Sequence, residues 1–88
     1  MKYALIYETA PDGMSRAAEN FPAHRARYEA FHERGTLLMV GPFTDRSGAL
    51  SVFTTREAAE EFAREDPFVV NGVIGKWEIH EWNEVLAP

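Results

Sequence analysis

His24 is the residue whose type and position offer the clearest chemistry. The imidazole of a histidine ordinarily has a pKa near ~6.5, so it can accept a proton and return it at neutral pH. An expected helix runs from Asn20, as N-cap, to Arg34, and steps of three and four from Phe21 place His24 in its apolar stripe. Such a histidine is either a proton-transfer group or a packed, hydrogen-bonded core residue, and the pattern by itself favours the packed residue.

Asp66 is the carboxylate that could orient such a base. It directly follows an expected alanine-rich helix over about Thr54–Glu65, and Pro67 keeps the residue before it out of the helical conformation. A carboxylate just past a helix C-terminus meets the negative end of the helix dipole, which costs roughly 0.3–1 kcal/mol, so we expect another contact to offset that cost. Either Asp66 only forms a turn with Pro67, or it orients His24 and stabilises the imidazolium.

Several further residues are candidates for binding a ligand: Tyr7, Gly41, Pro42, Ser47 and Phe68. The aromatic rings, with that of Phe43, could form the wall of a pocket for a planar ligand, although each is equally well explained as core. Gly41 ends a strand and lacks a Cβ, which lets a ligand approach the backbone. Ser47 and Asp45 lie in an expected turn, where such side chains usually bond nearby backbone groups.

The three histidines do not follow a metal-binding spacing. His24 and His32 are eight residues apart, which places them about 80° apart around a helix, and neither belongs to an HExxH pattern. The chain has no cysteine. His80, in the last expected strand, could still meet them in space. We predict no metal and no cofactor, and the loop 72–75 lacks the lysine and the following helix of a phosphate-binding loop.

The elements that must position these residues alternate as βαββαβ. Expected strands cover Lys2–Glu8, Thr36–Val40, Ala49–Phe53 and Lys76–Asn83. Gly35 ends the first helix, and the pattern from Thr54 to Glu57 is a capping box that opens the second. Residues 14–19 either begin the first helix or lead into it irregularly. The order predicts an α+β, ferredoxin-like domain in which both helices cover one face of a four-stranded antiparallel sheet.

The first three expected strands are apolar on both alternating faces. In the first strand Tyr3, Leu5 and Tyr7 point one way, and Ala4 and Ile6 point the other. A sheet face open to water should instead alternate with polar residues. We therefore expect a homodimer that pairs through the uncovered sheet face, and the sequence leaves further assembly of dimers open.

Size and charge restrict the class of protein. A chain of 88 residues with a net charge of −5 supports one domain over residues 1–88 and lacks the basic patch that nucleic acid requires. No stretch approaches the ~20 apolar residues that span a bilayer, and acid follows the N-terminal apolar run too soon for a signal peptide. We expect a soluble, cytoplasmic protein with neither a nucleic-acid nor a membrane partner.

The order and spacing of several segments resemble the YCII-related domain family of the dimeric α/β-barrel superfamily. The segments are His24, Gly35-Thr36-Leu37-Leu38, Gly41-Pro42, Asp66-Pro67-Phe68-Val69 and Gly72, and the resemblance extends from Lys2 to about Trp82. It implies a ferredoxin-like protomer paired into a dimeric α/β barrel, with His24 and Asp66 lining a pocket. Similar members include an enzyme that dechlorinates a chlorinated hydroxyquinol, and the superfamily includes muconolactone isomerases and cofactor-free monooxygenases.

Three functions remain open. The first is a cofactor-free enzyme of the isomerase, lyase or dehydrohalogenase type, in which His24 and Asp66 move a proton on a small aromatic or lactone-like compound. The second is a module that binds a small molecule, or assembles, without catalysis. The third is a cofactor-free monooxygenase that brings an electron-rich substrate to oxygen.

Overall fold

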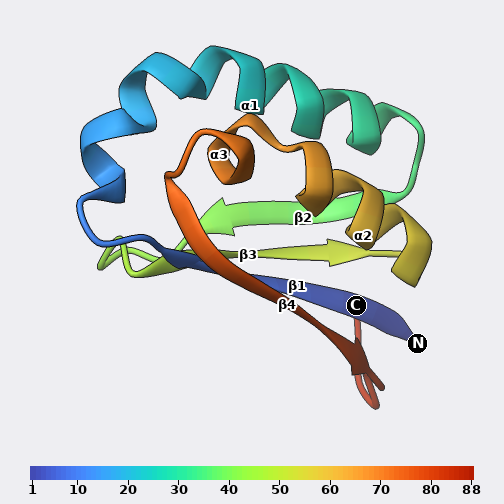
Figure 1. Ribbon diagram of the computed structural model, residues 1–88. Coiled ribbons are helices and arrows are strands. Elements are labelled where there is room, and N and C mark those ends of the chain that lie inside the picture. Colours follow the sequence, from blue (N-terminus) through green and yellow to red (C-terminus); the bar gives the residue numbers. More distant parts are fainter.

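The four expected strands form one antiparallel sheet. The computed structural model describes residues 1–88. It contains β1 (Lys2–Thr9), a 3-10 helix (Gly13–Arg16), α1 (Ala17–Glu33), β2 (Leu37–Pro42), β3 (Gly48–Phe53), α2 (Arg56–Glu65), α3 (Pro67–Val70) and β4 (Ile74–Trp82) (Figure 1). The strands lie in the order β2-β3-β1-β4, each antiparallel to its neighbour. The predicted α+β, ferredoxin-like fold is confirmed, with the short helix α3 as an addition.

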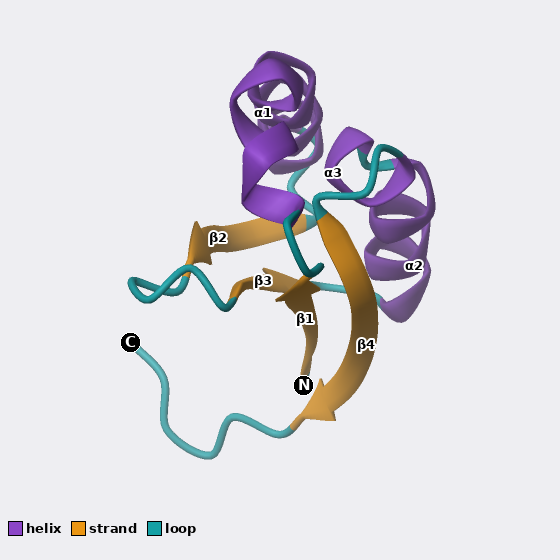
Figure 2. Cartoon of the chain, turned by 60° about the vertical axis from the view of Figure 1, so that its left-hand side comes forward, coloured by secondary structure: helices purple, strands orange, loops and turns teal.

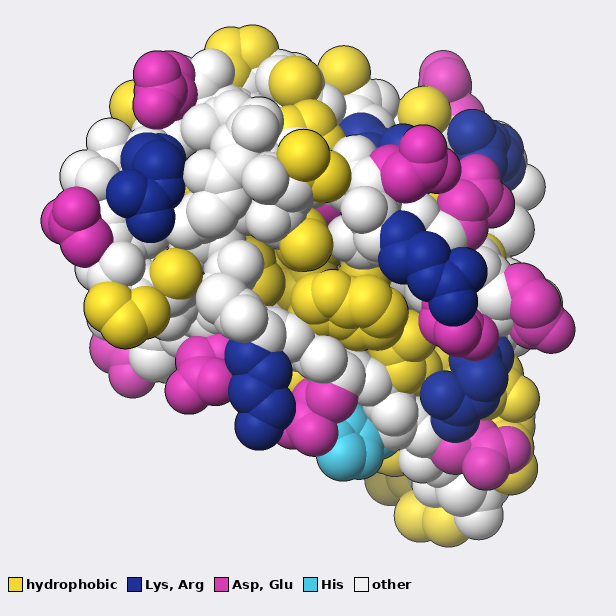
Figure 3. Space-filling model, viewed as in Figure 1, with side chains coloured by type: hydrophobic (Ala, Val, Ile, Leu, Met, Phe, Trp, Pro, Cys, Tyr) yellow, Lys and Arg dark blue, Asp and Glu magenta, His cyan; other side chains and the backbone are white.

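All helices lie on one face of the sheet. Figure 2 shows them stacked above the strands, while the chain that follows β4 curves below the opposite face. None of the helices combines the length and hydrophobicity that crossing a membrane would require. In Figure 3 hydrophobic side chains are visible between the helical layer and the sheet, with charged side chains around them. The sheet therefore has one covered face and one open face.

The core fills the space between the helices and the covered face. Tyr3, Leu5 and Tyr7 of β1 pair with Phe53, Ser51 and Ala49 of β3 on this face. The largest fully buried apolar side chains are Phe31, Phe53, Phe62, Leu5 and Leu37. The rings of Phe31 and Phe62 meet edge to face with centroids 5.2 Å apart, a geometry worth about 0.5–1.5 kcal/mol beyond the area it buries. Helices α1 and α2 are thereby fixed to each other and to the sheet.

Helix α1 begins at Ala17, so the expected start at Asn20 is wrong. Residues 14–16 belong to the 3-10 helix, and residues 17–19 form the start of α1, so the chain is helical throughout 14–19. Asn20 does not cap the helix, because its side-chain amide donates to the Arg16 carbonyl at 2.8 Å. Pro22, which lacks an N–H and would be favoured in a first turn, lies inside the helix. The residues before α1 are held by contacts with distant parts of the chain. For example, the Arg16 side chain donates to the Gly72 carbonyl at 2.8 Å.

The remaining boundaries differ from expectation by a few residues. Helix α2 is capped by Thr55, whose hydroxyl accepts from the Ala58 amide at 3.1 Å, so the expected cap at Thr54 is wrong by one residue. Gly35 ends α1 as predicted, at a φ of 84° that only glycine adopts freely. Strand β2 continues through Pro42, which pairs with Ala49, instead of ending at Val40.

The open face of the sheet has an apolar part and a polar part. Ala4 and Ile6 of β1 pair there with Val52 and Leu50 of β3, and Met39 of β2 adjoins them. Leu50 is 38% exposed and Met39 is 59% exposed. On β4 the same face carries Lys76, Glu78, His80 and Trp82. The expected apolar second face therefore belongs to β1, β2 and β3.

Candidate functional site

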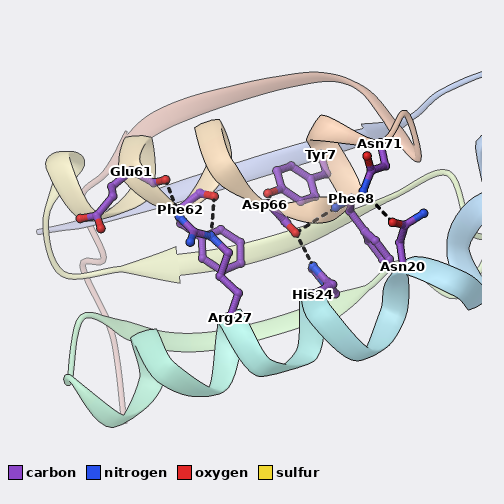
Figure 4. Close-up of polar contacts among 9 residues, drawn as sticks. All are labelled: Tyr7, Asn20, His24, Arg27, Glu61, Phe62, Asp66, Phe68 and Asn71. Carbon is purple, nitrogen blue, oxygen red and sulfur yellow. Dashed lines mark hydrogen bonds and ion pairs between the residues drawn. The ribbon is translucent and has the colours of Figure 1, made fainter.

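The fold brings His24 and Asp66 into contact, 42 residues apart in the sequence. His24 lies in the middle of α1, and Asp66 lies at the junction between α2 and α3 (Figure 4). The Nδ1 atom of His24 is 2.8 Å from Oδ1 of Asp66. The histidine is 8% exposed and the aspartate is fully buried. A buried carboxylate next to an imidazole nitrogen keeps the proton on that nitrogen.

Asp66 closes α2 and opens α3. Its Oδ1 atom also accepts the backbone amide of Phe68 at 3.1 Å, which makes Asp66 the N-cap of α3. The amides of α3 thus offset the unfavourable position of a carboxylate behind α2. The two alternatives for Asp66 are compatible, because the residue forms the turn with Pro67 and also contacts His24.

Tyr7 of β1 completes the surroundings of this carboxylate. Its hydroxyl donates to Oδ2 of Asp66 at 2.6 Å, and the tyrosine is 4% exposed. Burial, and then the negative charge of Asp66, raise the pKa of the Tyr7 phenol far above its ordinary value, so the phenol stays protonated and remains a donor. The two oxygens of Asp66 therefore accept three hydrogen bonds, from β1, α1 and α3.

Hydrogen bonds of two residues on the same face of α1 hold His24 in place. One turn before it, the Asn20 side chain accepts from the Asn71 amide at 2.7 Å. One turn after it, the guanidinium of Arg27 donates to the carbonyls of Glu61 at 2.8 Å and Phe62 at 3.2 Å (Figure 4). Residues at this spacing share one side of a helix. These contacts fix α1 to α2 and α3 on both sides of the pair.

The imidazole ring itself is held by aromatic contacts. It stacks on Phe68 with centroids 3.9 Å apart and planes 3° apart, and the ring of Tyr28 meets it edge on at 5.3 Å. Nδ1 is engaged with Asp66, and Nε2 has no hydrogen-bond partner in the chain. The ring is therefore fixed in orientation and keeps one nitrogen available to a ligand.

His24 lines a cavity of about 570 Å³ between α1 and the covered face of the sheet. Most of the surrounding side chains are apolar, among them Met14, Phe21, Pro42 and Phe62. Volume and composition suit a small, mostly apolar organic molecule with a few polar atoms. Of the residues predicted from sequence, Tyr7, Gly41, Pro42 and Phe68 line the cavity with His24, whereas Asp66 lies behind the imidazole.

Ser47 is not among the residues that line this cavity. It is exposed in the turn between β2 and β3, where its amide and hydroxyl donate to Oδ1 of Asp45 at 2.9 and 2.7 Å. Phe43 also lies outside the lining and is 39% exposed. Asp45 and Ser47 thus make the local turn contacts that aspartate and serine side chains favour.

The other two histidines lie away from His24. His32 contacts the carbonyl of Leu37 at 2.8 Å near the end of α1. His80 is on the open face of the sheet, 3.5 Å from the carboxylate of Glu78. His80 is thus on the opposite face of the sheet from His24, and His32 lies eight residues further along α1.

Sequence reasoning missed Arg46 and Ser51, which also line the cavity. Ser51 is 4% exposed on the covered face of β3, so it could have been found from strand alternation once the register was known. Arg46 lies in a turn, and no periodic pattern places a turn residue over a cavity.

Comparison with known proteins identifies relatives over nearly the whole chain. The model of the YCII-related domain matches residues 1–83. Two curated relatives, both called Protein YciI, come from Escherichia coli O6:H1 and from Shigella flexneri. Each is 31% identical over 99 residues, which cover 98% of this chain and 100% of the relative.

Two solved structures share the fold. The 5-chloro-2-hydroxyhydroquinone dehydrochlorinase from Burkholderia phenoliruptrix AC1100, in complex with 2,5-dihydroxybenzoquinone, superposes with a TM-score of 0.77 at 19% identity, covering 94% of each chain. A protein from Nitrosomonas europaea, named provisionally as an antibiotic biosynthesis monooxygenase, gives a TM-score of 0.58 at 13% identity, covering 93% of this chain and 98% of that one.

Proposed function

This chain belongs to the YCII-related domain family, and we propose that it is an enzyme that transfers a proton on a small aromatic or lactone-like compound. His24 is the base and later the acid, and Asp66 is the positioning partner. The observation that carries this proposal is the 2.8 Å contact between His24 and Asp66 beside an apolar cavity. Both groups belong to the chain, so the proton transfer itself requires no cofactor.

The chemistry follows from which imidazole nitrogen is engaged. A carboxylate oxygen accepts, so we assign Nδ1 as the donor to Asp66, and Nε2 then carries the lone pair that takes a proton from a bound ligand. The imidazolium that forms is stabilised by the carboxylate behind it. In an isomerisation the proton returns to another atom of the ligand. In an elimination, the electron pair left by the proton forms a new double bond, and a halide leaves with its bonding pair.

The comparison with the dehydrochlorinase supports an oxygenated aromatic ring as the first substrate class to examine. That enzyme acts on a chlorinated hydroxyhydroquinone. In the present chain the rings of Tyr28, Phe21 and Phe68 and the flat surface of Pro42 surround a space suited to a planar ring. The proposal therefore includes the dehydrohalogenase, isomerase and lyase types of reaction.

We also propose that the protein pairs as a homodimer through its open sheet face, which would complete a dimeric α/β barrel. The apolar part of that face, with Ile6, Leu50 and Met39, supports this arrangement because such a patch is unfavourable in water. A domain of this size also gains stability from a partner subunit.

The test is a turnover assay with chlorinated hydroquinones and small unsaturated lactones, following chloride release and ultraviolet absorbance. We expect His24→Gln to lower kcat by at least about a hundredfold, in the range that general acid–base groups contribute. His32→Gln is the matched control, because His32 lies outside this cavity. Unchanged turnover in His24→Gln would contradict the proposal.

The same assay separates the alternatives. A non-catalytic binding module would bind ring compounds in the wild type with no turnover of any of them. A monooxygenase would consume oxygen in step with product when given a hydroquinone, whereas proton transfer consumes none.

A further inference from the structure

Arg46 is the only residue lining the cavity whose side chain carries a permanent charge. The chain has 14 aspartate and glutamate residues, yet none of them lines the cavity. Asp66 lies behind His24 and is engaged in three hydrogen bonds. The lining therefore carries one permanent positive charge, and the negative charge of Asp66 lies behind His24, outside the lining.

The guanidinium of Arg46 is also free of partners within the chain. It forms no hydrogen bond and no ion pair, whereas the other arginines contact a carboxylate, a backbone carbonyl or an aromatic ring. The adjacent Asp45 directs its carboxylate to Ser47 instead. Arg46 is exposed, and its five N–H donors in a planar fork thus remain available to a ligand.

The backbone around Arg46 fixes where this side chain originates. Its φ is 64°, in the left-handed region that is uncommon for residues with a side chain. Its amide donates to the Phe43 carbonyl at 2.9 Å, and its carbonyl accepts from the Thr9 hydroxyl at 2.9 Å. Glycine or asparagine would adopt this conformation at lower cost, and these two hydrogen bonds help to hold Arg46 in it.

We propose that the ligand of this cavity is an organic anion, whose carboxylate or other oxyanion binds Arg46 while its ring lies near His24. This inference rests on the proposed function for the location of the site and extends it by stating the charge of the substrate. A guanidinium binds a carboxylate through two parallel hydrogen bonds, and Arg46 is exposed, so an anion that enters from solvent can reach it. The residue binds and orients the ligand, and His24 moves the proton.

Binding of probe pairs that match in shape and differ in charge tests this inference without turnover. The probes are benzoate against benzamide and 2,5-dihydroxybenzoate against 2,5-dihydroxybenzamide, titrated at constant ionic strength and followed by NMR shifts of cavity residues. We expect the wild type to bind each acid at least about tenfold more tightly than its amide. Arg46→Gln should remove that preference and leave the affinity for the amide within about twofold.

Lys76→Gln is the matched control. Lys76 is exposed on the open face of β4, forms no ion pair, and contributes the same charge to the protein without lining the cavity. It should retain the preference for acids. Arg46→Asn, which tolerates the left-handed conformation, serves as a second variant whose thermal unfolding confirms that the fold is intact.

Four results would overturn the inference: equal affinity of the wild type for acid and amide, no binding of any acid, an equal loss in Lys76→Gln, or an unchanged preference for acids in Arg46→Gln. The proposed function fails separately. If His24→Gln keeps full turnover while Arg46 still selects anions, only the proton-transfer role is lost. If turnover depends on His24 but Arg46→Gln binds acids normally, only the present inference is lost.

Discussion

His24 Nδ1 lies 2.8 Å from Asp66 Oδ1, and this contact crosses from the middle of α1 to the junction of α2 and α3. The carboxylate is fully buried and receives the Tyr7 hydroxyl and the Phe68 amide as well. No buried side-chain nitrogen or oxygen of the chain lacks a hydrogen-bond partner. The pair is therefore part of a polar network within an apolar core in which both oxygens of Asp66 are hydrogen-bonded, an arrangement that fixes geometry.

The contact with Asp66 predicts which tautomer His24 adopts. In neutral His24 the proton should be on Nδ1, because Asp66 accepts it there. ¹⁵N shifts of the imidazole at neutral pH should show a protonated Nδ1 and an unprotonated Nε2. Asp66→Asn should shift the population toward the Nε2-protonated form and lower turnover by at least about a hundredfold, because the buried acceptor becomes partly a donor. An unchanged tautomer in Asp66→Asn would mean that the contact does not orient the ring.

Removing the Tyr7 hydroxyl tests the other oxygen of Asp66. Tyr7→Phe leaves Oδ2 buried without its donor, so we expect a loss of about 1–3 kcal/mol in the free energy of unfolding at neutral pH. Because burial and Asp66 raise the pKa of Tyr7, its stabilisation is complete below the unfolded value near 10 and is lost as pH rises above it. Urea unfolding from pH 7 to pH 11 should show the difference between wild type and Tyr7→Phe shrinking with pH. A difference that is constant across this range would contradict the assignment.

The sequence was sufficient for the fold, and the contact between His24 and Asp66 was one of the alternatives that it left open. The covered face of β1, the alternation of Trp77 and Ile79 against His80 and Trp82, and the helix stop at Gly35 follow from local periodicity and turn chemistry. Asp66 could be singled out because a carboxylate behind a helix is unfavourable and requires compensation.

The missed features depend on tertiary contacts. Helix α1 starts before Pro22 because the preceding residues are held by distant partners, such as the Gly72 carbonyl on Arg16. The short helix α3 forms around the cap that Asp66 provides, and four residues carry no periodicity that could predict it. Arg46 lines the cavity because of how the hairpin turn folds over β1, which a turn sequence does not encode.

Glu84 should stabilise the folded protein at neutral pH and lose this effect in acid. Its carboxylate lies 2.9 Å from the Lys2 ammonium and 3.0 Å from the N-terminal one. Hydrogen bonds from Lys2 and then from the N-terminus lower the pKa of Glu84 to about 2, below its usual 4.5. The stabilisation is complete above pH 4.5 and is lost as pH falls toward 2. The difference in unfolding free energy between wild type and Glu84→Gln should disappear over this window, whereas Glu81→Gln, an exposed carboxylate without an ion pair, should show no such difference.

Two glycines at the cavity should respond differently to alanine. A Cβ on Gly48 would overlap the carbonyl oxygen of Tyr7, so Gly48→Ala must displace β3 from β1. We expect a loss of about 1–3 kcal/mol in urea unfolding, as overpacking typically causes, together with a disturbed Tyr7–Asp66 contact. Gly41→Ala is the matched control, because a Cβ there meets nothing within 4 Å and should leave stability unchanged or slightly raised. Equal effects of the two substitutions would contradict the close approach of β3 and β1 at Gly48.

A charge placed on the open sheet face tests the proposed homodimer. Leu50 lies in the apolar part of the open face and is 38% exposed, so Leu50→Glu would bury two like charges near each other in a sheet-to-sheet dimer. Sedimentation equilibrium should show a dimer for the wild type and a dissociation constant raised at least about a hundredfold for Leu50→Glu. Val70→Glu adds the same charge on α3, where Val70 is 64% exposed on the helical side, and should leave the dimer intact. A wild-type monomer at high protein concentration would contradict the pairing and would leave the apolar surface of β1, β2 and β3 in water.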